Sequence, residues 1–228
     1  MENRQTNLNF LLLGSVFSMI AIPMYHYDDM EVDRSQSDFI KVSTMNDRTN
    51  IVAYKMKAAL TDLLHKAISF SDAKSDSYGE VGDIDVNVLI YSLPSKLIMN
   101  TAKLFGDSLK GNVDENTLID IITYTLYIQS VINSTDYRNV DQILNRIHKI
   151  IHHRHYDYNS ADVIYDRLSI SDISSMAHIK AIRIKNLVNS IDKTKDATHV
   201  ERVICSINDS IYDLMIYVTM AFLKLYRI

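Results

Sequence analysis

Four histidines within eight positions, in the stretch HKIIHHRHYDY at residues 148–158, are the side chains best placed to bind a metal. On a helix, His148, His152 and His155 share one side at spacings of four and three residues, and Asp141 projects the same way. Three imidazoles and a carboxylate are ligands that Zn²⁺ accepts. A helical metal-dependent enzyme built on this cluster is therefore one hypothesis.

The sequence around these histidines favours a different interpretation. There is no H-E-x-x-H motif and no second ligand cluster to complete a tetrahedral site. Arg146, Lys149 and Arg154 make the rest of this predicted helix basic, which opposes binding of a dication. Histidine is also common at the boundary between core and water. We therefore expect boundary residues here, with no metal and no cofactor.

Other residues capable of chemistry are few. The single cysteine, Cys205, lies between Ile204 and Ile207 on a predicted helix, so we expect a core thiol. The triplets NST at 133–135 and NDS at 208–210 match the N-glycosylation sequon, but such triplets arise by chance and the second falls within a predicted helix. No G-x-S-x-G, P-loop, G-x-G-x-x-G or C-x-x-C motif occurs. The sequence predicts a protein that is not an enzyme.

Composition indicates a helical fold. Only 5 Gly and 2 Pro occur among 228 residues, and these are the residues on which the many turns of a β-rich fold depend. Apolar residues make up 47% of the chain, which is enough for a packed core. The net charge of −4 does not suit a dedicated nucleic-acid binder, which carries a basic excess. We expect no nucleic-acid partner.

The 3.6-residue period of apolar positions predicts seven or eight helices. They cover residues 49–70, 84–93, 95–106, 115–132, 140–155, 161–168, 172–191 and 199–226. Pro94 is expected in the first turn of the helix 95–106. Ser171 is expected to cap the helix that follows it. Capping boxes are expected where Asn139 precedes Gln142 and where Thr198 precedes Glu201.

Segment 115–132, ENTLIDIITYTLYIQSVI, is apolar on almost every side, so we expect it to be the central and most buried helix. The predicted fold is an all-α globular bundle around it. Three parts are expected: an N-terminal apolar segment with an acidic linker at 1–47, the bundle at 48–192, and a C-terminal amphipathic helix at 193–228. That last helix is expected to pack on the bundle or on a partner.

The most apolar run, LNFLLLGSVFSMIAIPM at residues 8–24, has three interpretations. It is a helix docked on the protein, a membrane anchor or a signal peptide. A spanning helix needs about 20 apolar residues, so the length fits a docked helix best. The apolar run from Leu214 to Leu223 is shorter still. Any membrane contact is therefore expected through residues 8–24.

The stretch FSDAKSDSYG at residues 70–79 suggests a family. We expect Phe70 to end one helix, Asp72 to begin another turn, and the aromatic-glycine pair Tyr78-Gly79 to end that turn. DIDVNVLIYSLP at 83–94 and AKLF at 102–105 follow. This order resembles the poxviral members of the B-cell lymphoma 2 (Bcl) fold. In that comparison 115–132 corresponds to the central helix of the family, and 140–155 to the helix after it. The chain has no Trp and so lacks the Asn-Trp-Gly-Arg element of the cellular apoptosis regulators.

The resemblance implies a non-enzymatic inhibitor of innate immune signalling, directed at NF-κB or interferon induction, that sequesters host signalling proteins in the host cytoplasm. It leaves a homodimer and membrane association open. The alternative within the fold is an apoptosis antagonist that binds pro-apoptotic amphipathic helices in a groove. Either function implies an apolar lining for the binding site, and the candidates are Leu89, Leu93, Leu97, Ile98 and Phe105.

Overall fold

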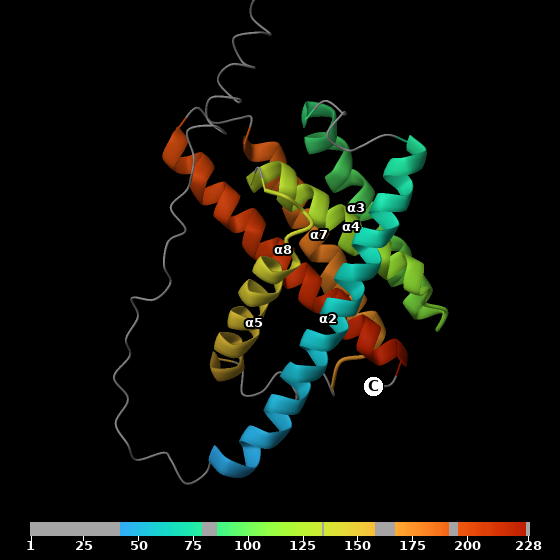
Figure 1. Ribbon diagram of the computed structural model, residues 1–228, viewed down its shortest axis with the longest axis vertical. Helices are drawn as coiled ribbons and strands as arrows, with labels where there is room; N and C mark the ends of the chain where they lie inside the picture. Colours follow the sequence, from blue (N-terminus) through green and yellow to red (C-terminus); the bar gives the residue numbers. More distant parts are fainter. Residues whose placement is uncertain (1–41, 79–85, 134, 158–166, 192–195, 227–228) are drawn as a thin grey trace, which may run out of the picture. The chain divides into compact units, whose positions relative to one another are not determined.

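The computed structural model describes residues 42–78, 86–133, 135–157, 167–191 and 196–226, with side chains except at 42–53, 74–78, 86–88, 148 and 151–157. Every regular element in these ranges is a helix, which confirms the all-α class for the described part of the chain. The six helices are α2 (Val42–Tyr78), α3 (Val86–Leu109), α4 (Glu115–Asn133), α5 (Val140–Asp157), α7 (Ile170–Ile191) and α8 (Ala197–Tyr226). The chain divides into two units, Met1–Thr44 and Met45–Ile228, and the helix packing belongs to the second unit (Figure 1).

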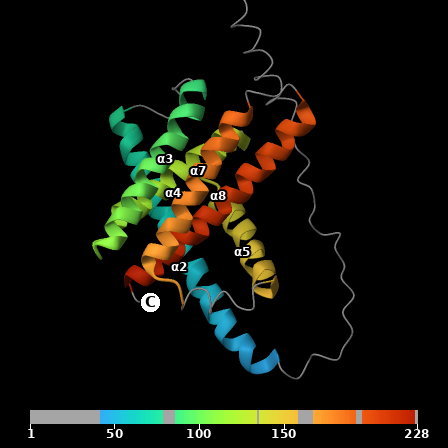
Figure 2. The ribbon, with the colours of Figure 1, turned by 180° about the vertical axis from the view of Figure 1, so that it is seen from behind.

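Four of the helices form a closed ring of contacts. Helix α3 packs against α4 and α7, and α8 packs against the same two helices from the other side of the ring (Figure 2). Their inward positions are filled by Leu, Ile and Val, among them Leu104, Leu118, Ile184 and Ile211, all at most 1% exposed. Burial of these side chains, at roughly 1.5–3 kcal/mol each, is the main force that holds the ring together.

Helices α4 and α8 run antiparallel in one fixed register. Glu115 accepts a hydrogen bond from the Tyr226 hydroxyl at one end of the pair. At the other end the Gln129 amide donates to the Tyr212 hydroxyl at 3.1 Å, and Asn133 pairs with Asn208. Each step along α4 is matched by an equal step backward along α8. The apolar seam between these polar pairs is therefore held in register at both ends.

The most continuously buried stretch lies in α8 and not in 115–132, where we expected it. Every residue from Asp213 to Leu223 is buried except Tyr217. Exposed or half-buried residues interrupt α4 at Asn116 and Tyr124. Each of these two helices packs against two others in the ring, but the packing of α8 on α7 is the most extensive helix pairing in the described structure. Sequence hydropathy ranks segments by composition and does not report how many neighbours cover them.

Pro94 does not divide two helices, contrary to prediction. Helix α3 continues through it from Val86 to Leu109. A proline inside a helix lacks the N–H that bonds the carbonyl four residues earlier, and it weakens the next bond along. The Ser95 hydroxyl donates to the Tyr91 carbonyl at 3.2 Å, which satisfies that neighbouring acceptor. Packing of α3 on α4 and α7 offsets the remaining cost.

Phe70 does not close a helix either. Helix α2 continues to Tyr78 through most of FSDAKSDSYG, so the turn predicted at Asp72 is wrong. The packing of α2 explains its length, because Met56, Leu63 and Ala67 are almost completely buried and Ser71 continues the same face one turn later. No glycine or proline interrupts this face before Tyr78.

Two helix starts differ from the predicted ones. Helix α7 is capped by Ser169 and not by Ser171: the Asp172 N–H donates to the Ser169 hydroxyl at 3.1 Å, and the Ser169 N–H donates to the Asp172 carboxylate at 2.8 Å. This reciprocal pair is a capping box. Helix α8 starts after Asp196, whose carboxylate accepts the Thr198 N–H, so the predicted Thr198 box is wrong.

The start of α5 partly agrees with prediction. The Asn139 side chain accepts the Gln142 N–H at 3.2 Å, as an N-cap does. The return bond of a box is replaced by a contact between the two side-chain amides at 3.3 Å.

Several predictions fall outside the described residues. These are the apolar run 8–24, most of the 1–47 segment, and nearly all of the helix expected at 161–168. Within the part of the chain that is described, no helix has both the length and the apolar character needed to cross a membrane.

Candidate interaction surface

The five candidate lining residues separate into two groups on α3. Leu89, Leu93 and Leu97 are 6%, 6% and 0% exposed and belong to the packed interior. Ile98 and Phe105 are partly exposed. The separation follows from helical geometry, because Leu89, Leu93 and Leu97 recur every four residues on the face toward α4 and α7, whereas Ile98 and Phe105 lie about a third of a turn or more away.

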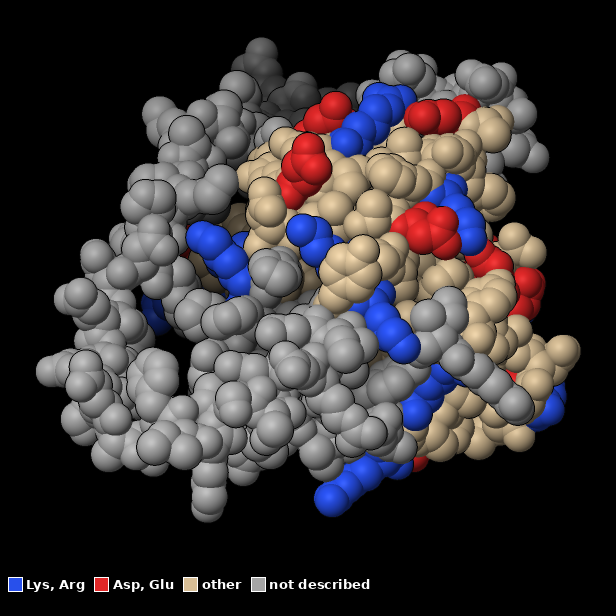
Figure 3. Space-filling model, turned by 60° about the horizontal axis from the view of Figure 1, so that its bottom comes forward, with Lys and Arg blue, Asp and Glu red and all other residues tan. Residues whose placement is uncertain are grey.

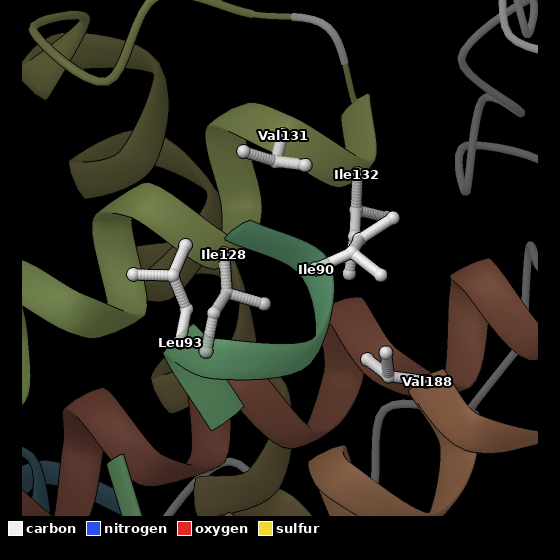
Figure 4. Close-up of a pocket in the computed structure, with 6 residues that line it drawn as sticks. All are labelled: Ile90, Leu93, Ile128, Val131, Ile132 and Val188. Carbon is white, nitrogen blue, oxygen red and sulfur yellow. The ribbon is translucent and has the colours of Figure 1, made fainter. Parts of the chain in front are cut away.

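A shallow apolar depression does exist beside the buried group. Ile90 and Leu93 of α3, Ile128, Val131 and Ile132 of α4, and Val188 of α7 line it (Figure 4). It has no room for a water molecule. This depression is a junction of three packed helices rather than a groove that would receive a peptide.

The outward side of α3 carries a second apolar face, which we call the outer seam and define as Tyr91, Ile98, Ala102, Phe105 and Leu109. Successive members are seven, four, three and four residues apart, which places them in one stripe. Tyr91 is 46% exposed and Leu109 is 65% exposed. Helix α3 therefore has apolar side chains on two faces, and only one of them is covered in the described structure.

Helix α7 extends this surface. The Thr101 hydroxyl of α3 lies 3.0 Å from Nδ1 of His178 on α7. Because Leu93 lies near Val188, farther along α7, the two helices run antiparallel. Thr101 and His178 set the register of this antiparallel pair. One turn further along α7 is Ile182, and one turn back along α3 is Ile98, so these two residues lie at the same level. Ile179 and Ile182 are 60% and 39% exposed.

Charge on these two helices is basic, in contrast to the chain as a whole. Their sequences contain five basic residues, Lys96, Lys103, Lys180, Arg183 and Lys185, against two acidic residues, Asp107 and Asp172, a balance of +3 where the whole chain carries −4. Lys180 is paired with Asp213 of α8, with Nζ 2.6 Å from Oδ2. The exposed Lys96 and Lys103, spaced seven residues apart, lie on the side of α3 next to α4, where Lys103 also donates to the Thr117 hydroxyl at 2.8 Å. The face in Figure 3 shows acidic and basic residues interspersed among uncharged ones.

A polar cluster fixes the far end of α2 to α4 and to the loop before α5. The buried Ser71 hydroxyl bonds the Tyr127 hydroxyl. Tyr137 packs its ring edge-on against Tyr127, with centroids 5.3 Å apart, and Arg138 forms an ion pair with Asp72 at 3.0 Å. Burial raises the pKa of Tyr127, so its proton stays in place at neutral pH. The Ser71 and Tyr127 hydroxyls are occupied by their bond to each other, so we interpret this cluster as one that stabilises the packing of α2 on α4.

The histidine cluster lies on the backbone of α5, but the side chains of His148, His152 and His155 are outside the described residues. Among the residues that are described, no three His, Cys, Asp or Glu side chains gather closely enough to hold a metal. Cys205 is exposed, contrary to prediction. It lies one residue after the buried Ile204 and two before the buried Ile207, and that places it on the outward side of α8.

Most of the outer seam was missed because our prediction looked for a groove and chose leucines on the inward face. The signal that would have identified it is the seven-, seven- and four-residue spacing of Tyr91, Ile98, Phe105 and Leu109, which is separate from the stripe of Leu89, Leu93 and Leu97.

Comparison with known proteins adds no assignment: no protein-family model matches the chain, and neither a curated protein nor a solved structure is significantly similar to it.

Proposed function

We propose that this chain is a non-enzymatic interaction protein that inhibits host innate signalling by sequestering a signalling protein, as the resemblance to poxviral Bcl-fold inhibitors implies. The proposal includes a Bcl-like arrangement of seven or eight helices around residues 115–132. It also includes a host cytoplasmic location, with any membrane contact made by residues 8–24.

The outer seam is the observation that supports this proposal. A helix buried on one side of a bundle normally presents polar residues on the other side. Helix α3 instead presents Tyr91, Ile98, Phe105 and Leu109, and α7 adds Ile179 and Ile182. Contiguous exposed apolar side chains, unlike singly scattered ones, mark interaction sites in soluble proteins. The seam also retains two of the candidates predicted from the sequence, Ile98 and Phe105.

The occupant we propose is an acidic amphipathic helix of the host protein. The four-and-three spacing of the seam is the spacing at which a second helix packs side chains between those of the first. Lys96 and Lys103 of α3, next to α4, and Arg183 and Lys185 of α7 give these two helices a basic charge that favours an acidic partner. Binding of such a helix weakens as salt is added, because exposed charge pairs are screened.

Substitution of Leu109, the most exposed member of the outer seam, and of Ile179 in its extension on α7 tests the proposal without disturbing the interior. Leu109→Glu and Ile179→Glu, at 65% and 60% exposure, place carboxylates on the surface and should leave the melting temperature unchanged. Both should abolish inhibition of NF-κB or interferon reporters and capture of the signalling partner together. Tyr54→Glu on α2, at 74% exposure, is the matched control and should retain both activities. Full inhibition by both seam variants would contradict the assignment.

A further inference from the structure

Asn133 of α4 and Asn208 of α8 form a reciprocal amide pair. The Asn133 side chain donates to Oδ1 of Asn208 at 2.9 Å, and the Asn208 side chain donates to Oδ1 of Asn133 at 2.9 Å. Both side chains are half-buried between the two helices. One turn away, Gln129 bonds Tyr212 in the same register. The pair therefore closes the end of the α4–α8 seam that lies opposite Glu115 and Tyr226.

Both members of this pair are also the acceptor asparagines of the two sequons, NST at 133–135 and NDS at 208–210. N-glycosylation attaches the sugar to the same side-chain nitrogen, Nδ2, and adds a bulky hydrophilic group there. A side-chain amide nitrogen has two hydrogens. Asn133 uses its Nδ2 for Asn208 and also for the carbonyl of Gln129 at 2.9 Å. Both donor positions of Asn133 are thus occupied in the folded protein.

We propose that the amide pair and a glycan on either asparagine are mutually exclusive, so that α4 and α8 pack together only on a chain that is not glycosylated at Asn133 or Asn208. A sugar on Asn133 replaces one of two used hydrogens. A sugar on either residue also needs space where the partner helix lies.

The order of synthesis makes this exclusion consequential in a compartment that carries out glycosylation. Residue 133 emerges 75 residues before residue 208, so Asn133 has no partner while the chain is being made. A chain entering the endoplasmic reticulum would present this sequon in an open state and accept the sugar before the pair forms. The fold is therefore suited to synthesis in the cytosol, and it disfavours a signal peptide among the three interpretations of residues 8–24.

The experiment compares the full chain in the cytosol with the same chain directed into the endoplasmic reticulum by an added signal peptide. The matched variant is Thr135→Ala/Ser210→Ala, which removes both sequons and leaves both asparagines intact. Ser210 is buried, and its hydroxyl donates to the carbonyl of Ser206 in the preceding turn of the same helix at 2.8 Å, so alanine fits its place. Glycosidase-sensitive gel shifts report the sugar, and protease resistance and thermal melting report the fold.

In the lumen, the wild-type chain should carry glycans and lose protease resistance, whereas the variant should be unglycosylated and folded. Both should fold in the cytosol with similar melting temperatures. An unglycosylated and folded wild-type chain in the lumen would overturn the argument that Asn133 receives a sugar before Asn208 is made. Glycosylated wild-type protein that melts at the temperature of the cytosolic form would overturn the proposal. So would a variant that folds in the cytosol but fails in the lumen, because sugars would not then be the cause.

Discussion

Removal of Lys180 should strongly destabilise the fold, because it leaves a carboxylate inside the helix ring. Lys180 and Asp213 join α7 to α8, with Nζ 2.6 Å from Oδ2, and their side chains are 20% and 6% exposed. Loss of one member of a fully buried pair costs about 3–5 kcal/mol, since the other charge stays desolvated. Water reaches Lys180 in part, so for Lys180→Met we expect a cost somewhat below that range, about 2–3 kcal/mol.

Urea unfolding at neutral pH measures this cost as a lower midpoint with an unchanged slope. The double variant Lys180→Met/Asp213→Leu should recover most of the lost stability, because replacement of a buried pair by apolar residues is often neutral. Arg183→Met, on the exposed side of the same helix, is the control and should change the free energy of unfolding by less than about 0.5 kcal/mol. If Lys180→Met matches that control, the pair is not the desolvated contact described above.

Three further perturbations test other parts of the molecule. Leu97→Ala should cost about 2–5 kcal/mol by leaving a cavity, whereas Leu109→Ala should cost less than about 0.5 kcal/mol, and equal costs in urea unfolding would contradict the division of α3 into two faces. Burial raises the pKa of Tyr212, so as the pH rises above about 10 the phenol loses its proton more readily in the unfolded chain than in the folded protein. The free energy of unfolding therefore falls over this range. In Tyr212→Phe, urea unfolding should show a smaller fall in the free energy of unfolding between about pH 8 and about pH 11 than in the wild type. His148→Gln combined with His152→Gln should change stability by less than about 0.5 kcal/mol, and stoichiometric zinc in untagged protein prepared without chelators would refute the boundary interpretation.

The helical class was predictable because it depends on features that every segment carries. The 3.6-residue period and the scarcity of Gly and Pro act locally and do not depend on the order of packing. Helix boundaries were harder to predict. Ser169 and Asp196 cap their helices instead of Ser171 and Thr198, and the competing caps are only two residues apart in sequence. Such choices are decided by contacts that a local pattern does not contain.

Two of the errors share one physical cause, which is packing between distant segments. Pro94 and the polar stretch after Phe70 both carry signals for a break in the helix. Helix α3 continues because Leu93 and Leu97 on either side of Pro94 are buried, and α2 continues past Phe70 with Ala67 and Ser71 buried. Burial of several apolar side chains, at roughly 1.5–3 kcal/mol each, exceeds the cost of a proline in a helix, about 3 kcal/mol.

The candidate surface was predictable only in part. The sequence placed all five candidate residues on α3, but it did not show which of the two apolar faces of this helix the rest of the bundle would cover. Leu89 and Leu97 face inward because α4 and α7 lie on that side. Helices far apart in the sequence make this choice, since α7 begins at Ile170 and α3 at Val86.

Closure of the helix ring by α8 also has a kinetic consequence. The pairs that join α4 to α8 connect residues 75 to 111 positions apart, and the chain must bring these together before the seam forms. Non-local contacts of this kind slow folding, because loop-closure entropy is lost before the contacts form. During synthesis α8 is made after the other three helices of the ring, so the faces of α4 and α7 that α8 covers stay exposed until it is complete. For that interval the inward leucines and isoleucines of α4 are exposed to other chains, and a slowly translated or truncated α8 should direct the protein toward aggregation.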